Sequence, residues 1–284
     1  MRAFAALALR LLPAIVLLAA CASGGIPSPR AQQFLPPATV APTPHSPPSP
    51  TPSQTATPAP TASPTSTPSP LPTKTATPPP QYAPSGLIER GPRSSSKVAF
   101  TFDLGSGAGA TLAVLAALKT HEVPATFFVT GQWAELNPGL LKAIVAGGHA
   151  VANHSYSHPD FTQLGREAML EELAKTEQAV QRIAGVSTRP YWRPPFGALN
   201  AIVLRVVAEG GYEAVYWTLD STDWREDSTT ASITARVLKY VEPGAIIVMH
   251  GSAEKTALAL PGLIPQMRAR GLQPTSLADL LEHP

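Results

Sequence analysis

Cysteine is almost absent from the sequence: its 284 residues include one, Cys21. A single cysteine excludes an intramolecular disulfide and any metal site built on several thiolates. Concentrated positive charge is absent too, since 21 Lys and Arg residues are scattered among 19 Asp and Glu residues and the formal net charge is +2. So small a charge gives no reason to expect a nucleic-acid partner.

The sequence also lacks an apolar run long enough to span a membrane as a helix, which needs about 20 such residues. The apolar stretch at residues 11–20 is shorter and follows two arginines near the N-terminus. A positive start, a short apolar core and then small residues are the layout of a secretory signal. The end of this stretch, Leu-Ala-Ala-Cys at residues 18–21, resembles the lipobox of bacterial lipoproteins.

That resemblance implies that residues 1–20 are a signal peptide and that Cys21 becomes the lipidated N-terminus. We therefore expect an extracytoplasmic protein, anchored by lipid to the outer face of the bacterial cytoplasmic membrane or to the cell surface. An uncleaved anchor, or an ordinary signal peptide beside an incidental cysteine, is the alternative.

Proline is unevenly distributed, with 21 of the 33 prolines lying between Pro27 and Pro92 among Ser, Thr and Ala. Such a segment buries too little apolar surface to offset the entropy lost on ordering it. We expect residues 21–95 to form a disordered Pro/Thr/Ser-rich stalk without chemistry. Residues 96–284 are long enough for one substantial core and are expected to fold as a monomeric domain.

Within that domain, strand-like and helix-like segments alternate. Short β-favouring runs occur at residues 98–102, 125–129, 150–152, 214–218 and 245–249, and apolar residues at helical spacing lie between them and after the last. This alternation predicts an α/β fold with a parallel sheet closed as a barrel.

Reactive side chains follow several of the predicted strands: Asp103, His154, the pair Asp220 and Asp223, and His250. The carboxyl ends of parallel barrel strands meet on one face, where active sites form. We therefore expect these groups to converge on one mouth.

Individually, these residues have ordinary explanations beside the functional ones. His154 and His158 share a face if they lie on a helical turn, so both rings could reach one metal ion. A carboxylate beside a guanidinium stays ionised, which suits Asp103 and Arg193 to general-base catalysis. Asp103 could instead cap a helix, Arg193 could be a structural ion-pair partner, and His250 could be a buried core histidine.

Five motifs occur in one order between residues 101 and 250: Thr-Phe-Asp-Leu-Gly, His-x-x-x-His, Arg-Pro-Pro-Phe-Gly, Asp-Ser-Thr-Asp-Trp and Val-Met-His. Together they resemble the NodB-homology polysaccharide deacetylases, carbohydrate esterase family 4. The resemblance covers residues 97–281. It implies a distorted (β/α) barrel and a divalent metal, most often Zn²⁺, with Co²⁺, Ni²⁺ or Mn²⁺ as alternatives.

The resemblance also assigns roles by matching position. Asp103 is expected to be the general base and Arg193 its orienting partner. His250 is expected to be the general acid, tuned by Asp223. The remaining roles are metal ligation by His154 and His158, an acetyl pocket walled by Trp224 and Val248, and an oxyanion contact from the backbone N–H of Phe196.

The first motif departs from the family pattern, because Leu104 stands where a second aspartate normally supplies the third metal ligand. Leucine cannot coordinate a metal. Asp103 could ligate directly, Asp160 could substitute, or water could complete the coordination shell. A two-histidine site is expected to bind zinc more weakly than a three-ligand site.

The expected function is removal of N-acetyl groups from N-acetylglucosamine-containing polysaccharide, either peptidoglycan or an exopolysaccharide. One alternative is a catalytically weak or silent carbohydrate-binding pseudoenzyme with Trp192, Trp217 and Trp224 as sugar platforms, which Leu104 favours. The other is a deacetylase of a different acetylated substrate on the same scaffold.

Overall fold

The structure, a computed structural model, describes residues 86–282. The predicted signal peptide, Cys21 and most of the predicted stalk lie outside the described residues. No helix among residues 86–282 is both long enough and apolar enough to cross a membrane.

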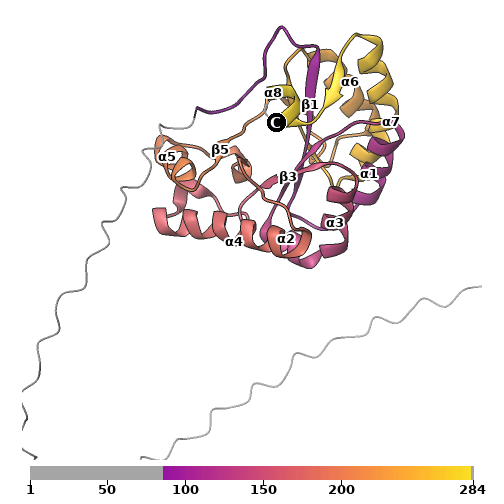
Figure 1. Ribbon diagram of the computed structural model, residues 1–284. Helices are drawn as coiled ribbons and strands as arrows, with labels where there is room; N and C mark the ends of the chain where they lie inside the picture. The colour runs from indigo at the N-terminus through magenta and orange to yellow at the C-terminus, as the bar shows by residue number, and fades with distance from the viewer. Residues whose placement is uncertain (1–85, 283–284) are drawn as a thin grey trace, which may run out of the picture. The chain divides into compact units, whose positions relative to one another are not determined.

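A single sheet of parallel strands forms the centre of the domain (Figure 1). Its strands lie side by side in the order β5-β4-β3-β2-β1-β7-β6, and β8 pairs with β1 off this path. Their bounds are β1 Lys97–Leu104, β2 Thr126–Val129, β3 Ala150–Asn153, β4 Tyr191–Trp192, β5 Glu213–Ala214, β6 Leu219–Asp220, β7 Ile246–His250 and β8 Gln273–Thr275. The predicted parallel α/β fold is confirmed.

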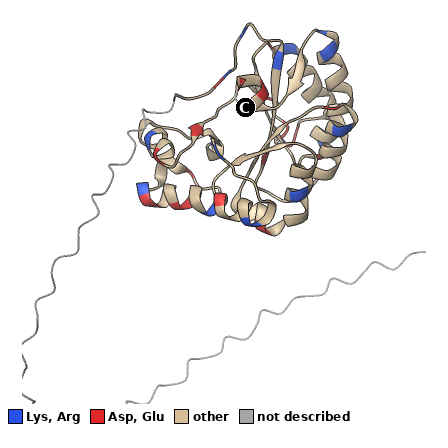
Figure 2. Ribbon diagram, in the orientation of Figure 1, with Lys and Arg blue, Asp and Glu red and all other residues tan. Residues whose placement is uncertain are grey.

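Helices surround the sheet, and Figure 1 shows β1 and β3 inside the ring that they form. They are α1 Thr111–Thr120, α2 Gly131–Leu136, α3 Pro138–Ala146, α4 Arg166–Ala184, α5 Ala201–Glu209, α6 Thr230–Tyr240, α7 Glu254–Ala269 and α8 Leu277–Leu281. Helix α4 ends at Ala184, because Gly185 adopts the left-handed conformation with φ 71° that commonly terminates helices. Charges of both signs lie along α4 (Figure 2).

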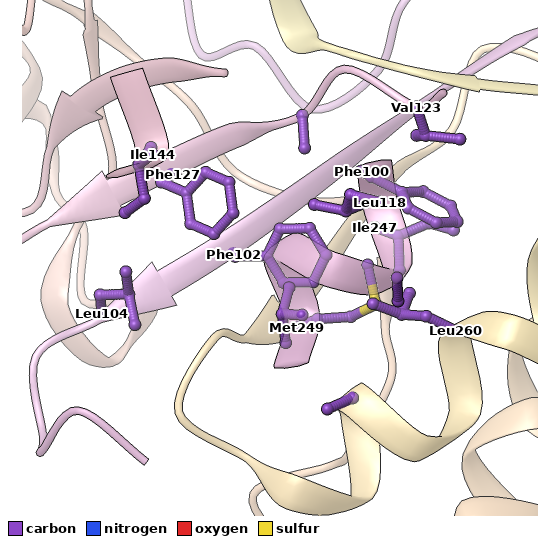
Figure 3. Packing of buried hydrophobic residues seen from close by; sticks show 14 of the residues in the cluster. Phe100, Phe102, Leu104, Leu118, Val123, Phe127, Ile144, Ile247, Met249 and Leu260 are labelled. Carbon is purple, nitrogen blue, oxygen red and sulfur yellow. The ribbon is translucent and has the colours of Figure 1, made fainter. Parts of the chain in front are cut away.

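The main core lies between the sheet and these helices. Strand β1 contributes Phe100, Phe102 and Leu104, which are all fully buried in one cluster (Figure 3). Burial of each such side chain contributes about 1.5–3 kcal/mol. Alternate residues of a strand point to opposite faces, so Asp103 lies on the other face of β1. The rigid central strand therefore carries both core side chains and a candidate catalytic carboxylate.

The sheet curls but does not close directly. Strands β5 and β6 are at the two ends of the order, and no pairing joins them among the described residues. The strand predicted at residues 214–218 is wrong in extent: only Ala214 belongs to β5, and β6 begins at Leu219. The sheet is a curled half-barrel, so strand pairing within residues 86–282 does not fully close the barrel that the alternation predicted.

A segment before β1 crosses this open seam. Residues 87–91, which we call the N-terminal strap, form one bridge between Ile88 and Val215 and another between Arg90 and Ala245. These residues fall in the segment predicted to be stalk. The packed part of the chain therefore begins before the boundary expected at Ser96, because backbone pairing with distant residues holds the strap in place.

Candidate active site

Asp103 and Arg193 form a buried ion pair. Arg193 Nη1 donates to Asp103 Oδ1 at 2.7 Å, and the guanidinium is completely buried over the ring of Phe128. Burial acts to raise the pKa of Asp103, but the positive charge of Arg193, helped by His154, overcomes it and holds the pKa below its ordinary value. Asp103 is therefore a largely buried carboxylate that its charged and polar neighbours favour in the ionised form.

His154 follows β3 and is held as a neutral ring. Its Nδ1 lies 3.0 Å from the carbonyl oxygen of Arg193, and since a carbonyl can only accept, Nδ1 carries the proton. Burial lowers the pKa of His154 to about 4, although Asp103 opposes the shift. The unprotonated Nε2 therefore lies on the side of the ring that approaches Asp103 Oδ2, at 3.8 Å.

His158 joins His154 through a loop and not through a helical turn, so the helical explanation of their spacing is wrong. Residues 154–160 have no helix, and both Ser155 and His158 have positive φ, 68° and 62°. The two imidazole centroids are nonetheless 4.8 Å apart. Burial lowers the pKa of His158 as well, although Asp103 opposes the shift. The two rings therefore lie close together, but a loop brings them there, and their binding of one metal ion stays a prediction.

Long-range contacts, which sequence reasoning missed, fix this loop. Glu172 of α4 accepts from the backbone N–H groups of Tyr156 and Ser157 at 2.7 and 2.8 Å, and from the Ser157 hydroxyl at 2.8 Å. At its start, the buried Asn153 accepts from Ser155 N–H at 2.9 Å. The spacing of residues in the sequence gives no sign that a glutamate on the next helix serves this loop.

His250 and Asp223 form a second pair across the mouth. His250 ends β7, its Nδ1 lies 2.8 Å from Asp223 Oδ1, and its backbone N–H donates to Asp223 Oδ2 at 2.7 Å. Burial acts to lower the pKa of His250, but the hydrogen bond and charge of Asp223 raise it above its ordinary value. Thr256 also donates to Asp223, whose side chain is fully enclosed. Asp223 thus holds the ring by Nδ1 and leaves Nε2 as the free nitrogen.

These groups surround one cavity of about 420 Å³. Strand register brings them together, since Asp103 on β1 is the direct neighbour of His250 on β7. The cavity is lined by Asp103, His154, His158, Pro194, Phe196, Gly197, Trp217, Asp220, Trp224, Val248 and His250. Every predicted site residue within the described range lines it except Arg193 and Asp223, which hold Asp103 and His250 from behind.

Two aromatic side chains flank the opening. Phe196 is 75% exposed and Trp224 is 60% exposed, so both present apolar surface to solvent. Phe196 has a left-handed φ of 57° and packs its ring against His158 at 4.6 Å. Val248 is buried at the cavity wall, and Trp217 adds a second wall. Trp192 is completely buried and cannot be the exposed sugar platform that the alternative hypothesis considered.

Asp160 does not replace the third ligand that is missing at Leu104. Leu104 is fully buried in the core beside Gly251, where a Cβ added to that glycine would lie 2.9 Å from the leucine side chain. Asp160 is not among the cavity-lining residues, because its Oδ1 caps the short helix η1 (Phe161–Gln163) through the N–H and hydroxyl of Thr162. The substitution by Asp160 that the sequence left open is therefore not supported.

The remaining donors still suit a divalent metal. His154 Nε2 is an unprotonated nitrogen 3.8 Å from the carboxylate oxygen of Asp103, and a cation would relieve this contact between two electron-rich atoms. That distance is less than twice the zinc–ligand distance of about 2.0–2.2 Å. Among residues 86–282, however, no three His, Cys, Asp or Glu residues form a ready metal-binding group. The donor set fits a metal held by few protein ligands.

Comparison with known proteins identifies the family. The model of the polysaccharide deacetylase family matches residues 90–215. The peptidoglycan-N-acetylglucosamine deacetylase of Bacillus cereus is 34% identical over 196 residues, which span 68% of this chain and 70% of that protein. The chain belongs to the polysaccharide deacetylase family. The distorted (β/α) barrel predicted from the motifs is confirmed with it.

Solved structures of the family show the same fold. The deacetylase PdaA of Bacillus subtilis, a family 4 carbohydrate esterase, matches with a TM-score of 0.66 and 32% identity over 69% of this chain and 85% of that one. A family 4 pseudoenzyme of Bacillus anthracis matches with a TM-score of 0.65 and 28% identity over 70% of each chain. A mutant of a family 4 pseudoenzyme with restored enzymatic activity matches at 0.67 and 29% over 70% of this chain and 72% of that one. Polysaccharide deacetylases therefore include both active and inactive relatives of this chain.

Proposed function

We propose that this chain is a metal-dependent hydrolase that removes N-acetyl groups from N-acetylglucosamine-containing polysaccharide, such as peptidoglycan or an exopolysaccharide. The observation that carries the proposal is that two hydrogen-bonded pairs, Arg193 with Asp103 and Asp223 with His250, present a carboxylate and an imidazole to one cavity. Asp103 is held ionised by Arg193, and His250 is held ready for protonation by Asp223. A base and an acid on neighbouring strands suit hydrolysis of an amide.

When bound at His154 and His158, a divalent metal such as Zn²⁺ supplies Lewis-acid polarisation of the acetamide carbonyl and makes a nearby water more acidic. Asp103 accepts the proton of the attacking water through Oδ2, the oxygen that Arg193 does not hold. The new bond forms between the water oxygen and the carbonyl carbon. His250 then donates its proton to the nitrogen as the carbon–nitrogen bond breaks, which yields acetate and a free amine.

The cavity also suits the substrate class. Trp217 and Val248 offer apolar walls for an acetyl methyl group, and the exposed rings of Phe196 and Trp224 offer faces on which sugar rings can pack. The backbone N–H of Phe196 is assigned to the developing oxyanion, since such donors stabilise charge that appears in the transition state. Removing one such donor commonly costs about 100- to 1,000-fold in kcat.

The test is acetate release from chito-oligosaccharides by the purified full-length chain, first freed of metal and then supplied with Zn²⁺ or Co²⁺. The matched control is Asp103→Asn, which keeps the shape of the side chain and removes the base. We expect metal-dependent release that the control loses by at least about 100-fold. Equal release by the control would exclude Asp103 as the base.

A carbohydrate-binding pseudoenzyme is the second candidate, and Leu104 favours it because the side chain lies in the core and leaves the metal with few protein ligands. This candidate predicts that oligosaccharide binding persists, depends on Trp224 and yields no acetate with any metal. Acetate release from an O-acetylated glycan, but not from chito-oligosaccharides, would instead assign a different acetylated substrate to the same site.

We also propose that the chain acts outside the cytoplasmic membrane, tethered through a lipid on Cys21 and working as a monomer. The support is the signal-like layout of residues 1–21, whose only cysteine directly follows small residues. Metabolic labelling with a radioactive fatty acid should label the full chain and fail to label Cys21→Ser. Equal labelling of the two proteins would contradict this anchor.

A further inference from the structure

The N-terminal strap, residues 87–91, fills the seam between β5 and β6. Ile88 N–H donates to Ala214 O at 2.8 Å, and Tyr216 N–H donates to Ile88 O at 2.7 Å. Thr218 Oγ1 donates to Glu89 O at 2.7 Å. The strap therefore pairs with residues 214–218 and takes the position that β6 would occupy beside them in a closed barrel.

The strap is also fixed at its far end. Gly91 N–H donates to Gly244 O at 2.8 Å, just before β7. Backbone contact here is close, since a Cβ on Gly244 would lie 2.6 Å from Pro92 O. Arg90 forms an ion pair with Glu242 at 3.1 Å, and Ile88 packs against the cluster that contains Phe128. Both sides of the seam are thereby joined through the strap.

The segment that the strap holds reaches directly into the active site. Tyr216 O accepts from Arg193 Nη2 at 3.2 Å, while Nη1 of the same guanidinium holds Asp103. The Nε atom of Arg193 is buried without a partner among the described residues. Among the described residues, Tyr216 O is therefore one of two groups to which the guanidinium of Arg193 donates, and Asp103 is the other.

The next residue shapes the cavity. Trp217 lines the cavity and stacks on Tyr216, with ring centroids 4.0 Å apart. The fit against the Arg-Pro-Pro-Phe-Gly loop is tight, because a Cβ on Gly197 would lie 2.7 Å from the Tyr216 hydroxyl and 2.9 Å from the Trp217 ring. A shift of residues 216 and 217 would thus move both the wall and the arginine that orients the base.

We infer that the N-terminal strap is a positioning segment of the active site: it replaces the missing β5–β6 pairing and, through residues 214–218, holds Arg193 and Trp217 in their working geometry. This inference rests on the proposed deacetylase function for its kinetic consequence, but not for its structural one. No residue of the strap is among those that line the active-site cavity, so the strap acts through Tyr216 and Trp217.

The test compares Ile88→Pro, Ile88→Ala and Ile88→Val in the full chain. Proline removes the N–H that bonds Ala214 O, alanine keeps that N–H and removes side-chain packing, and valine is the conservative variant. Arg93→Ala is the control, since Arg93 is exposed and lies just beyond the strap, and although it pairs with Glu242, its removal leaves the pair between Arg90 and Glu242 in place. The readouts are kcat and KM for acetate release, hydrogen exchange of the Tyr216 amide, and thermal unfolding.

We expect Ile88→Pro to lower kcat by about tenfold, which corresponds to about 1.4 kcal/mol of transition-state stabilisation. Exchange of the Tyr216 amide should accelerate in the same variant. In Ile88→Val and Arg93→Ala, kcat and the exchange rate should stay within about twofold of the original chain, a smaller change than the loss of one net hydrogen bond would cause. Ile88→Ala should fall between them. If the proline variant does not unfold cooperatively, the alanine variant decides by the same readouts.

The inference is overturned if a folded Ile88→Pro chain keeps both the original kcat and the original exchange of the Tyr216 amide. It is also overturned if kcat falls equally in Arg93→Ala. If the original chain releases no acetate at all, the proposed function fails by itself. Exchange of the Tyr216 amide then decides whether the strap holds residues 214–218.

Discussion

Replacing Arg193 by methionine tests the central ion pair most directly. The change keeps a long side chain and leaves Asp103 in a buried position without its cation. Removing one partner of a buried pair costs about 3–5 kcal/mol, because the remaining charge is uncompensated. The purified full chain, kept metal-free with a chelator, should therefore lose about that much free energy of unfolding at neutral pH.

The loss should depend on pH with a definite sign. In the original chain the pKa of Asp103 is lowered on folding, so its stabilising effect is complete above the unfolded pKa of about 3.9 and is lost only as pH falls through the folded pKa. Without Arg193, burial dominates and raises the folded pKa. The variant then loses stability as pH rises from 5 to 8, so the difference in free energy of unfolding between the original chain and Arg193→Met widens.

Urea unfolding at pH 5, 6.5 and 8 measures this gap. The double variant Asp103→Asn with Arg193→Met is the control, because it has no carboxylate at position 103. Its free energy of unfolding should differ from that of the original chain by an amount that is constant with pH. A difference between the original chain and Arg193→Met that is equal at pH 5 and pH 8 would refute the reasoning. So would a cost below about 1 kcal/mol, the value of an ordinary exposed pair.

Three further predictions concern the other parts of the site. Asp223→Asn removes the charge that raises the pKa of His250, so the alkaline limb of the kcat profile should move to lower pH; an unmoved limb would exclude His250 as the acid. Glu172→Ala frees the loop of His158 and should weaken Zn²⁺ binding by about 10- to 100-fold in chelator competition. The exposed neighbour Glu171→Ala should leave that affinity unchanged, and equal effects would contradict the loop contact. Trp224→Ala should raise KM for chito-oligosaccharides about tenfold with little change in kcat, since stacking on an exposed ring contributes uniform binding; a KM unaffected by the change would remove it from the substrate site.

The sequence predicts the site well where a side chain is fixed by a regular strand. Asp103 and His250 end apolar runs that become β1 and β7, and parallel pairing necessarily sets them side by side. Arg193 follows a strand of only two residues, β4, which is too short to show periodicity. Its position is recognisable only from the motif around it.

Features set by distant backbone contacts could not be predicted. The two histidines meet because Glu172 holds a loop with left-handed residues, and i to i+4 spacing gives the right pair for the wrong reason. The strap lies at the end of a proline-rich stretch and contains no strong strand pattern. Its conformation depends on pairing with residues 214–218 and Gly244, which are more than 120 positions away.

The presence of a buried leucine at position 104 bears on whether the site is active. Because neighbouring residues of β1 face opposite ways, leucine at this position completes the core while Asp103 remains in the cavity. A chain without catalytic need would gain nothing from the buried pair of Asp103 and Arg193, since well-packed apolar residues are commonly as stable as a buried ion pair or more so. The pair is nevertheless complete, and a second pair, His250 with Asp223, faces the same cavity. On the proposed function, Leu104 therefore points to weaker metal affinity, while the proposed base Asp103 and the proposed acid His250 both keep their partners.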